Sequence, residues 1–431
     1  TTGDNNVAVG LNALDLNTTG EENVAIGSNA MLDNTTGSRN IAIGRRSLQE
    51  NTTAEGNTAV GNSAMQNNTT GATNVAVGTA SLDANTTGAN NTAIGGNSLS
   101  ANTTGSNHTA VGVNALFTNT TSADNTAVGR CAAYTNTTGS CLVAMGNNAL
   151  RFNTTASANV AIGRDAMCAN TTGANGVAVG YGALCKNTTG SSNTAVGTDA
   201  LTANTTGASN VAVGLLALNA NTTGTGNVGV GCGSLLVHTT GAFTTALGFR
   251  AMCSNTTVSG NTGLGACALK KNTTGGGNTA VGYQSLQLNT TGANNTAMAC
   301  DALAFNTTGS DNTAVGYQAL CKNTTGYDNI AVGRGSLTGN TTGHSNVALG
   351  DYAMLVNTTG HSNVAIGYKA LCNHTTGAGN FGFGFQAGAE GGMINVTSEN
   401  NRAIFGNNSV TNAYVKVAFT VTSDARDKTN F

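Results

Sequence analysis

The sequence predicts an all-β protein, a parallel β-solenoid (β-roll) of about 22–23 coils with 17 residues in each coil. Three observations support this prediction. A motif of the form Asn-Val-Ala-Val-Gly recurs every 17 residues from Asn6 to Asn380, without insertion or deletion. Its β-branched residues alternate with a small one, as in a strand. Two glycine columns bend the chain within each repeat, which leaves no room for a stable helix.

With Asn6 as position 1, the repeat reads N-[VT]-A-[VI]-G-x-x-[AS]-L-x-x-N-T-T-G-x-x. Positions 2 to 4 are predicted to form the strand. Glycine at position 5 and at most copies of position 15 predicts bends with positive φ. Coils that stack at the strand spacing of about 4.8 Å would build a rod roughly 105 Å long.

The core of each coil is expected to hold the aliphatic residue of position 4, such as Val281 or Val315, and the leucine of position 9. This pair buries less surface than is needed to order 17 residues. Stability should therefore come from the continuous ladder, from stacked side chains and from other chains. The small residues of positions 3 and 8, among them Ala280 and Ala314, are the expected contact between chains.

Composition narrows the possible functions. The 431 residues carry a net charge of −2 and only 8% of them are charged, so no basic field exists to hold nucleic acid. No run of 18 apolar residues exists, so we expect no membrane insertion. The ten cysteines and five histidines lack metal-ligand spacing, so neither a metal site nor a cofactor is expected.

The period divides the chain. Residues 1–388 are predicted to form the solenoid shaft, and residues 389–422, where the period is lost, a short β-rich C-terminal cap or trimerisation region. One strand of this cap is expected at Ala403-Ile404-Phe405-Gly406. Residues 423–431 follow it.

The repeat NTAVGYQAL-x-x-NTTG, seen at Asn278 to Leu286 and at Asn312 to Gly326, resembles the repeats of phage tail-fibre and "tail fiber domain" proteins. It is more loosely similar to the head repeats of trimeric autotransporter adhesins. The ending Thr422 to Asn430 resembles the start of the intramolecular chaperone domain of phage fibres and endosialidases.

These resemblances imply a homotrimer, a left-handed β-roll and a chaperone that directs assembly and then cuts itself off. By the same resemblance Ser423 would be the nucleophile of that cleavage, Lys428 its base and Asp424 an assisting residue. Only three residues follow Lys428, so residues 423–431 are expected to be a stub of the chaperone. We expect no enzyme here, apart from a single self-cleavage if the rest of that domain is present.

The expected function is therefore mechanical: the shaft of a trimeric phage tail fibre, located in the virion, which projects a tip that binds a host surface glycan or receptor. The alternative is a cell-surface adhesin or a self-assembling extracellular filament.

The Asn-Thr-Thr column supports two interpretations. Each copy is formally an N-glycosylation acceptor, yet stacked Asn and Thr side chains can also bond coil to coil. The crowding of sugars about 4.8 Å apart favours the ladder. A threonine array that binds ice is a further alternative. The candidates for glycosylation or for the ladder include Asn17, Asn34, Asn85, Asn102, Asn289 and Asn323.

Two further columns hold candidate residues. Cys168 and Cys185 occupy position 10 in successive coils, within disulfide range of each other, whereas the other cysteines are expected to be free. An aromatic column at position 6 could stack on sugars or contact another subunit. Its members are Tyr181, Phe249, Tyr283, Tyr317, Tyr368 and Phe385.

Overall fold

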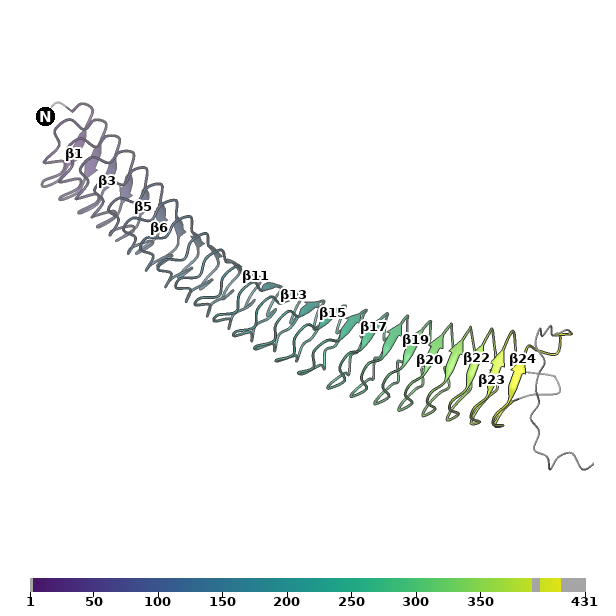
Figure 1. Cartoon of the computed structure of the whole chain (residues 1–431). Coiled ribbons are helices and arrows are strands. Elements are labelled where there is room, and N and C mark those ends of the chain that lie inside the picture. The colour runs from purple at the N-terminus through teal and green to yellow at the C-terminus, as the bar shows by residue number, and fades with distance from the viewer. Residues whose placement is uncertain (1–2, 390–395, 412–431) are drawn as a thin grey trace, which may run out of the picture.

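The structure, a computed structural model, describes residues 3–389 and 396–411, which form one continuous β-solenoid. Figure 1 shows a long, gently curved rod of stacked coils, with the N-terminus at one end and β24 at the other. Each coil carries one three-residue strand, and within the two described ranges no helix is present. The predicted all-β parallel solenoid with 17 residues per turn is therefore confirmed.

The strands are β1 (Val7–Val9), β2 (Val24–Ile26), β3 (Ile41–Ile43), β4 (Thr58–Val60), β5 (Val75–Val77), β6 (Thr92–Ile94), β7 (Thr109–Val111), β8 (Thr126–Val128), β9 (Val143–Met145), β10 (Val160–Ile162), β11 (Val177–Val179), β12 (Thr194–Val196), β13 (Val211–Val213), β14 (Val228–Val230), β15 (Thr245–Leu247), β16 (Thr262–Leu264), β17 (Thr279–Val281), β18 (Thr296–Met298), β19 (Thr313–Val315), β20 (Ile330–Val332), β21 (Val347–Leu349), β22 (Val364–Ile366), β23 (Phe381–Phe383) and β24 (Ala403–Phe405).

Each strand pairs in parallel with the next one along the chain, and like positions pair with like. Ala280 of β17 pairs with Ala297 of β18, for example. The last step is different, because Phe381 of β23 pairs with Ala403 of β24, 22 residues later. The strand expected at Ala403 exists, and the ladder runs past the boundary predicted at residues 388 and 389.

The core lies on one side of each strand only. The alanine of position 3, the small residue of position 8 and the leucine or methionine of position 9 are fully buried, as at Ala280, Ser285 and Leu286. The prediction that position 4 lies in the core is wrong: Val281 and Val315 are half-buried on the outer face. Successive strand side chains alternate, so positions 2 and 4 share the face opposite the buried alanine.

The alanine columns also cannot join two chains, contrary to our expectation, because Ala280 and Ala314 are closed off within their own chain. The adjacent leucines explain why only small residues fit there. At Gly229, which replaces alanine at position 3, a Cβ atom would lie 3.1 Å from Cγ of Leu218 in the preceding coil. The narrow interior is therefore filled by leucine from one wall and methyl groups from the other.

The two glycine columns act differently. The predicted positive φ is found at position 5, for instance 134° at Gly316, where a Cβ atom would also lie 2.6 Å from the carbonyl oxygen of Gly333. At position 15 the prediction is wrong, because φ there is not in the left-handed region. Close approach governs that column: a Cβ atom on Gly173 would lie 2.5 Å from the carbonyl oxygen of Gly190.

Candidate functional site: the outer face of the strand column

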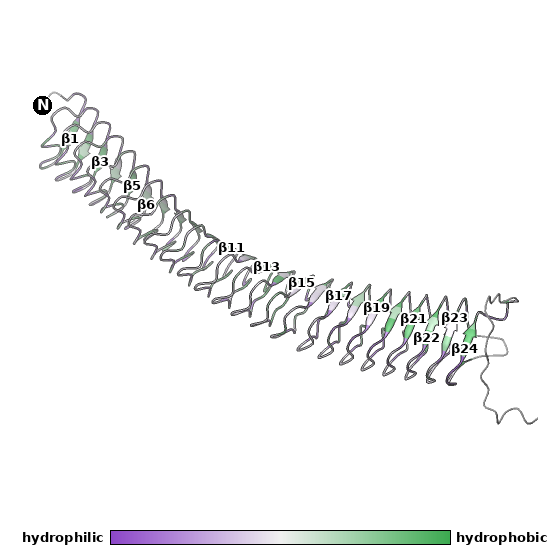
Figure 2. Cartoon of the chain, viewed as in Figure 1, coloured by the Kyte–Doolittle hydropathy of each residue, from purple (hydrophilic) through white to green (hydrophobic). Residues whose placement is uncertain are grey.

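The strands present a second, outward face made by positions 2 and 4. We call these two columns the sheet face; they run from Val7 and Val9 of β1 to Phe381 and Phe383 of β23. Figure 2 shows strands in the green of hydrophobic residues along much of the rod. Parallel, in-register pairing is what aligns these side chains into columns.

The sheet face holds no charged residue in any of these coils. Position 2 is valine, isoleucine or threonine up to Phe381, and position 4 is valine, isoleucine, leucine, methionine or phenylalanine. Several position 4 side chains are well exposed, from 36% at Val77 to 57% at Val9. Charged residues lie in the turns instead, where Arg164 pairs with Asp165 and Arg334 with Asp351.

The sheet face is large for a single chain. A fully exposed aliphatic side chain corresponds to about 60–120 Å², so partial exposure along 23 coils leaves on the order of 1,000 Å² of apolar surface. The largest apolar patch of an ordinary monomer covers a few hundred Å². A standard protein interface buries about 800 Å² on each partner. The sheet face is therefore large enough to bind another protein surface.

The asparagine column is buried and forms a ladder. The Nδ2 group of Asn34 donates to Oδ1 of Asn17 in the preceding coil at 2.9 Å and to the carbonyl of Gly37 in its own coil at 3.0 Å. The other candidates of this column make the same two kinds of bond, as shown by Asn85, Asn102, Asn289 and Asn323. A glycan on Nδ2 would displace these buried bonds, so the folded rod does not expose these acceptors.

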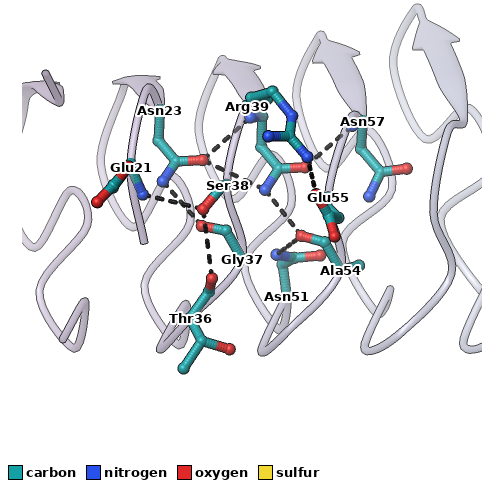
Figure 3. Close-up of polar contacts among 11 residues, drawn as sticks. Glu21, Asn23, Thr36, Gly37, Ser38, Arg39, Asn51, Ala54, Glu55 and Asn57 are labelled. Atoms are coloured by element: carbon teal, nitrogen blue, oxygen red, sulfur yellow. Dashed lines mark hydrogen bonds and ion pairs between the residues drawn. The ribbon is translucent and has the colours of Figure 1, made fainter. Parts of the chain in front are cut away.

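The asparagine of position 1 forms a second ladder that the repeat pattern did not lead us to expect. Its Nδ2 group donates to the carbonyl of position 15, as in the bond from Asn23 to Gly37, and its Oδ1 accepts the backbone N–H of the next copy, Asn40. Figure 3 shows Asn23 directed at Gly37 and, one coil further on, Asn51 directed at Ala54. The backbone carbonyl of position 15 thus accepts hydrogen bonds from the asparagine side chains of both positions 1 and 12, as Gly37 does from Asn23 and Asn34.

The two threonine columns differ in exposure. At position 13 the hydroxyl donates to the carbonyl of the next threonine in the column, as from Thr307 to Thr324 at 3.0 Å. At position 14 the threonines, such as Thr291 and Thr325, are exposed. Only one threonine column therefore faces solvent, and the regular two-column array that an ice surface would need is absent from the described coils.

The candidate cysteines are neighbours with free thiols. Cys168 and Cys185 lie in adjacent coils that are bonded through the Ala169 amide and the Cys185 carbonyl at 2.9 Å. Burial, reinforced by the neighbouring Cys185, raises the pKa of the Cys168 thiol to about 11. Both thiols are therefore protonated at neutral pH, and a thiol in this form is a poor nucleophile.

Three histidines occupy asparagine positions in the interior. His108 stands at position 1, and His238 and His374 stand at position 12; all three are buried. Burial lowers their pKa below the usual value, so they remain neutral. Where His238 replaces asparagine, Oδ1 of Asn221 has no hydrogen-bond partner among the described residues. The same holds for Oδ1 of Asn357 beside His374, so the position 12 ladder is interrupted at both coils. At His108 the position 1 ladder continues, because Nδ1 of His108 accepts the backbone N–H of Asn125 at 3.2 Å.

The remaining predicted site residues, Ser423, Asp424 and Lys428, lie outside the described residues. Within residues 3–389 and 396–411, no group of three or more His, Cys, Asp or Glu side chains lies close enough to hold a metal ion. The same ranges contain no helix that could cross a bilayer. Comparison of the chain with protein-family models and with curated proteins finds no match.

Proposed function

We propose that this chain is the shaft of an extracellular fibre, in which three copies associate through the sheet face. The observation that carries the proposal is the uncharged, half-exposed surface of aliphatic and threonine side chains that follows the strands along the rod. A soluble single chain gains nothing from displaying such a surface, because exposed apolar patches of this size favour association. Three sheet faces can meet around a common axis and bury this surface from water.

Burial against other chains also addresses the weakness of a single coil. Each coil buries one leucine and two small residues, and the rest of its order depends on hydrogen bonds to its neighbours. Enclosing positions 2 and 4 would add two more buried side chains per coil in each chain. A rod built in this way would be thin, stiff and of fixed length.

The resemblance of the repeat and of the C-terminal segment to phage fibres leads us to propose a tail fibre of a virion as the specific setting. In that setting the shaft would hold a receptor-binding tip away from the particle. The function of the shaft itself is mechanical, and it depends on association and length.

A charge placed on the sheet face tests the proposal. Val281→Lys together with Val315→Lys puts two lysines at position 4 of β17 and β19. Thr291→Lys with Thr325→Lys puts the same charges in the same coils, at the exposed position 14. Molar mass by sedimentation equilibrium should correspond to three chains for the wild type and for the threonine variant. It should fall to one chain for the valine variant, because buried, unpaired lysines are costly.

A wild-type chain that stays monomeric at micromolar concentration would contradict the proposal. So would a valine variant that assembles as tightly as the threonine variant. Circular dichroism of each variant shows whether the coils themselves remain folded.

A further inference from the structure

We infer that the shaft carries a binding site for an extended, uncharged, β-1,4-linked polysaccharide, of the cellulose or chitin class, along the corner next to the sheet face. The site is a series of large side chains at position 6, which we call the position-6 row: Tyr181, Leu215, Phe249, Tyr283 and Tyr317. They recur every 34 residues, in every second coil. This inference concerns the side of the rod and does not depend on the association of chains proposed above.

The position-6 row is exposed and regularly spaced. Its five side chains are between 49% and 53% exposed. The intervening coils carry smaller residues at the same position, namely Thr198, Cys232, Ala266 and Cys300. The next positions at the same 34-residue spacing hold polar residues, Asn147 before Tyr181 and Asp351 after Tyr317, so the series ends there. Large and small residues therefore alternate over nine consecutive coils.

The spacing along the rod can be taken from stacked rings elsewhere in it. At position 16 the rings of Tyr327 and His344 lie 4.7 Å apart, and those of His344 and His361 lie 4.8 Å apart, one coil per step. Two coils therefore advance about 9.5 Å, twice the strand spacing. This length is close to the disaccharide repeat of an extended β-1,4-linked glucan or chitin chain, in which every second sugar presents the same face.

Because the aromatic residues of the row stand in every second coil, their ring faces are free to contact a sugar. Where aromatic residues occupy position 6 in adjacent coils they cover one another, as Tyr368 and Phe385 do at 5.4 Å. Among the described residues, Tyr283 and Tyr317 make no ring contact and have no cation over their faces, whereas Arg164 lies over Tyr181 and Arg250 over Phe249. Tyr283 and Tyr317 are therefore the centre of the site.

The chemistry of the row selects a neutral sugar chain. The axial C–H groups of a β-linked pyranose form an apolar face that packs against an aromatic ring, which presents its electron-rich face to them. No charged residue belongs to the row itself. Beside the two central rings, Gln284 and Gln318 offer amide groups to sugar hydroxyls. A ring every second coil would meet one sugar of every disaccharide.

Binding to insoluble polysaccharide tests the inference on the full chain. Wild-type protein should sediment with microcrystalline cellulose or with chitin. Tyr283→Ala combined with Tyr317→Ala should lower the apparent affinity at least ten-fold. Phe243→Ala combined with Phe305→Ala removes two rings that are equally or more exposed but lie off the row, at positions 17 and 11, and should leave binding unchanged.

Two further variants test the spacing itself. Leu215→Tyr completes the row and should tighten binding. Ala266→Tyr adds the same ring one coil out of phase, between Phe249 and Tyr283, and should weaken binding because the new ring stacks on its neighbours. Equal gains from both variants would mean that aromatic content, and not spacing, governs binding.

The inference is overturned if the wild type binds neither polysaccharide, or if the double tyrosine variant binds as well as the wild type. A change in molar mass of the double tyrosine variant would also overturn it, since the row would then belong to a contact between chains. Molar mass and polysaccharide binding are separate measurements, so failure of this inference and failure of the fibre association can be told apart.

Discussion

The inner and outer sides of the strand column follow different rules, although both are built from small or aliphatic residues. On the inner side, position 3 is alanine with glycine as its only substitute. Where glycine replaces alanine, the leucine of the preceding coil occupies the space of the missing Cβ atom, as Leu371 does at Gly382. On the outer side, position 4 ranges from valine to phenylalanine. The inner columns are restricted by their own chain. Position 4 remains apolar without any such restriction, and this is the observation behind the proposed association of chains.

The largest expected effect comes from the inner side. Leu201→Ala removes a fully buried position 9 side chain and should lower the free energy of unfolding by about 2–5 kcal/mol, because the narrow interior cannot collapse around the cavity. Leu215→Ala is the same substitution at the exposed position 6, and it should cost less than about 1 kcal/mol. Urea unfolding followed by circular dichroism measures both. Equal losses would mean that the coil has no specific core.

The comparison also shows what the sequence could and could not predict. Period, strand position and parallel pairing follow from identical residues at a fixed spacing, because in-register stacking is the arrangement that places like on like. Which side of the strand faces inward could not be predicted, because the Val-Ala-Val pattern alternates whether valine or alanine points into the core. Hydrophobicity alone would place the valines in the interior. The alanine faces inward because leucines such as Leu286 leave space there only for a small side chain.

The candidate surfaces were predictable to different degrees. The asparagine column could be recognised because asparagine recurs at position 12 in all but two coils, and both interpretations of it could be stated from sequence. The sheet face was missed because its position 4 residues were assigned to the core. The left-handed backbone at positions 7 and 9 had almost no signal, since Leu286 adopts a φ of 48° that leucine normally avoids.

An intermediate effect is expected where the inner polar column is interrupted. His238→Asn restores a donor to Oδ1 of Asn221 and removes the unpaired Nδ1 of His238. Satisfying a buried polar group in this way should raise the free energy of unfolding by about 1–3 kcal/mol. Thermal unfolding at pH 7.5 measures the gain. The matched control is His361→Asn, the same substitution at an exposed position 16, which removes one surface ring contact with His344 and should not raise the free energy of unfolding.

The same variant should change the pH dependence of stability. Burial lowers the pKa of His238, so the unfolded chain takes up a proton at a higher pH than the folded one. Stability is then complete above the unfolded pKa of about 6.5 and is lost as the pH falls towards the lowered folded pKa. His238→Asn should flatten this loss between pH 7 and pH 5. An unchanged slope would show that His238 does not contribute to it.

The smallest effect concerns the turn that joins the two sides. Arg46, at position 7, has a φ of 57°, in the left-handed region, where asparagine is tolerated better than arginine. Other coils carry asparagine at this position with the same backbone, for example Asn97 and Asn114. Arg46→Asn should therefore stabilise the protein by roughly 0.5–1 kcal/mol. The adjacent Arg45→Asn is the control, because Arg45 is outside that region and should gain nothing. A similar shift from both variants would mean that removal of positive charge, and not relief of the backbone, is responsible.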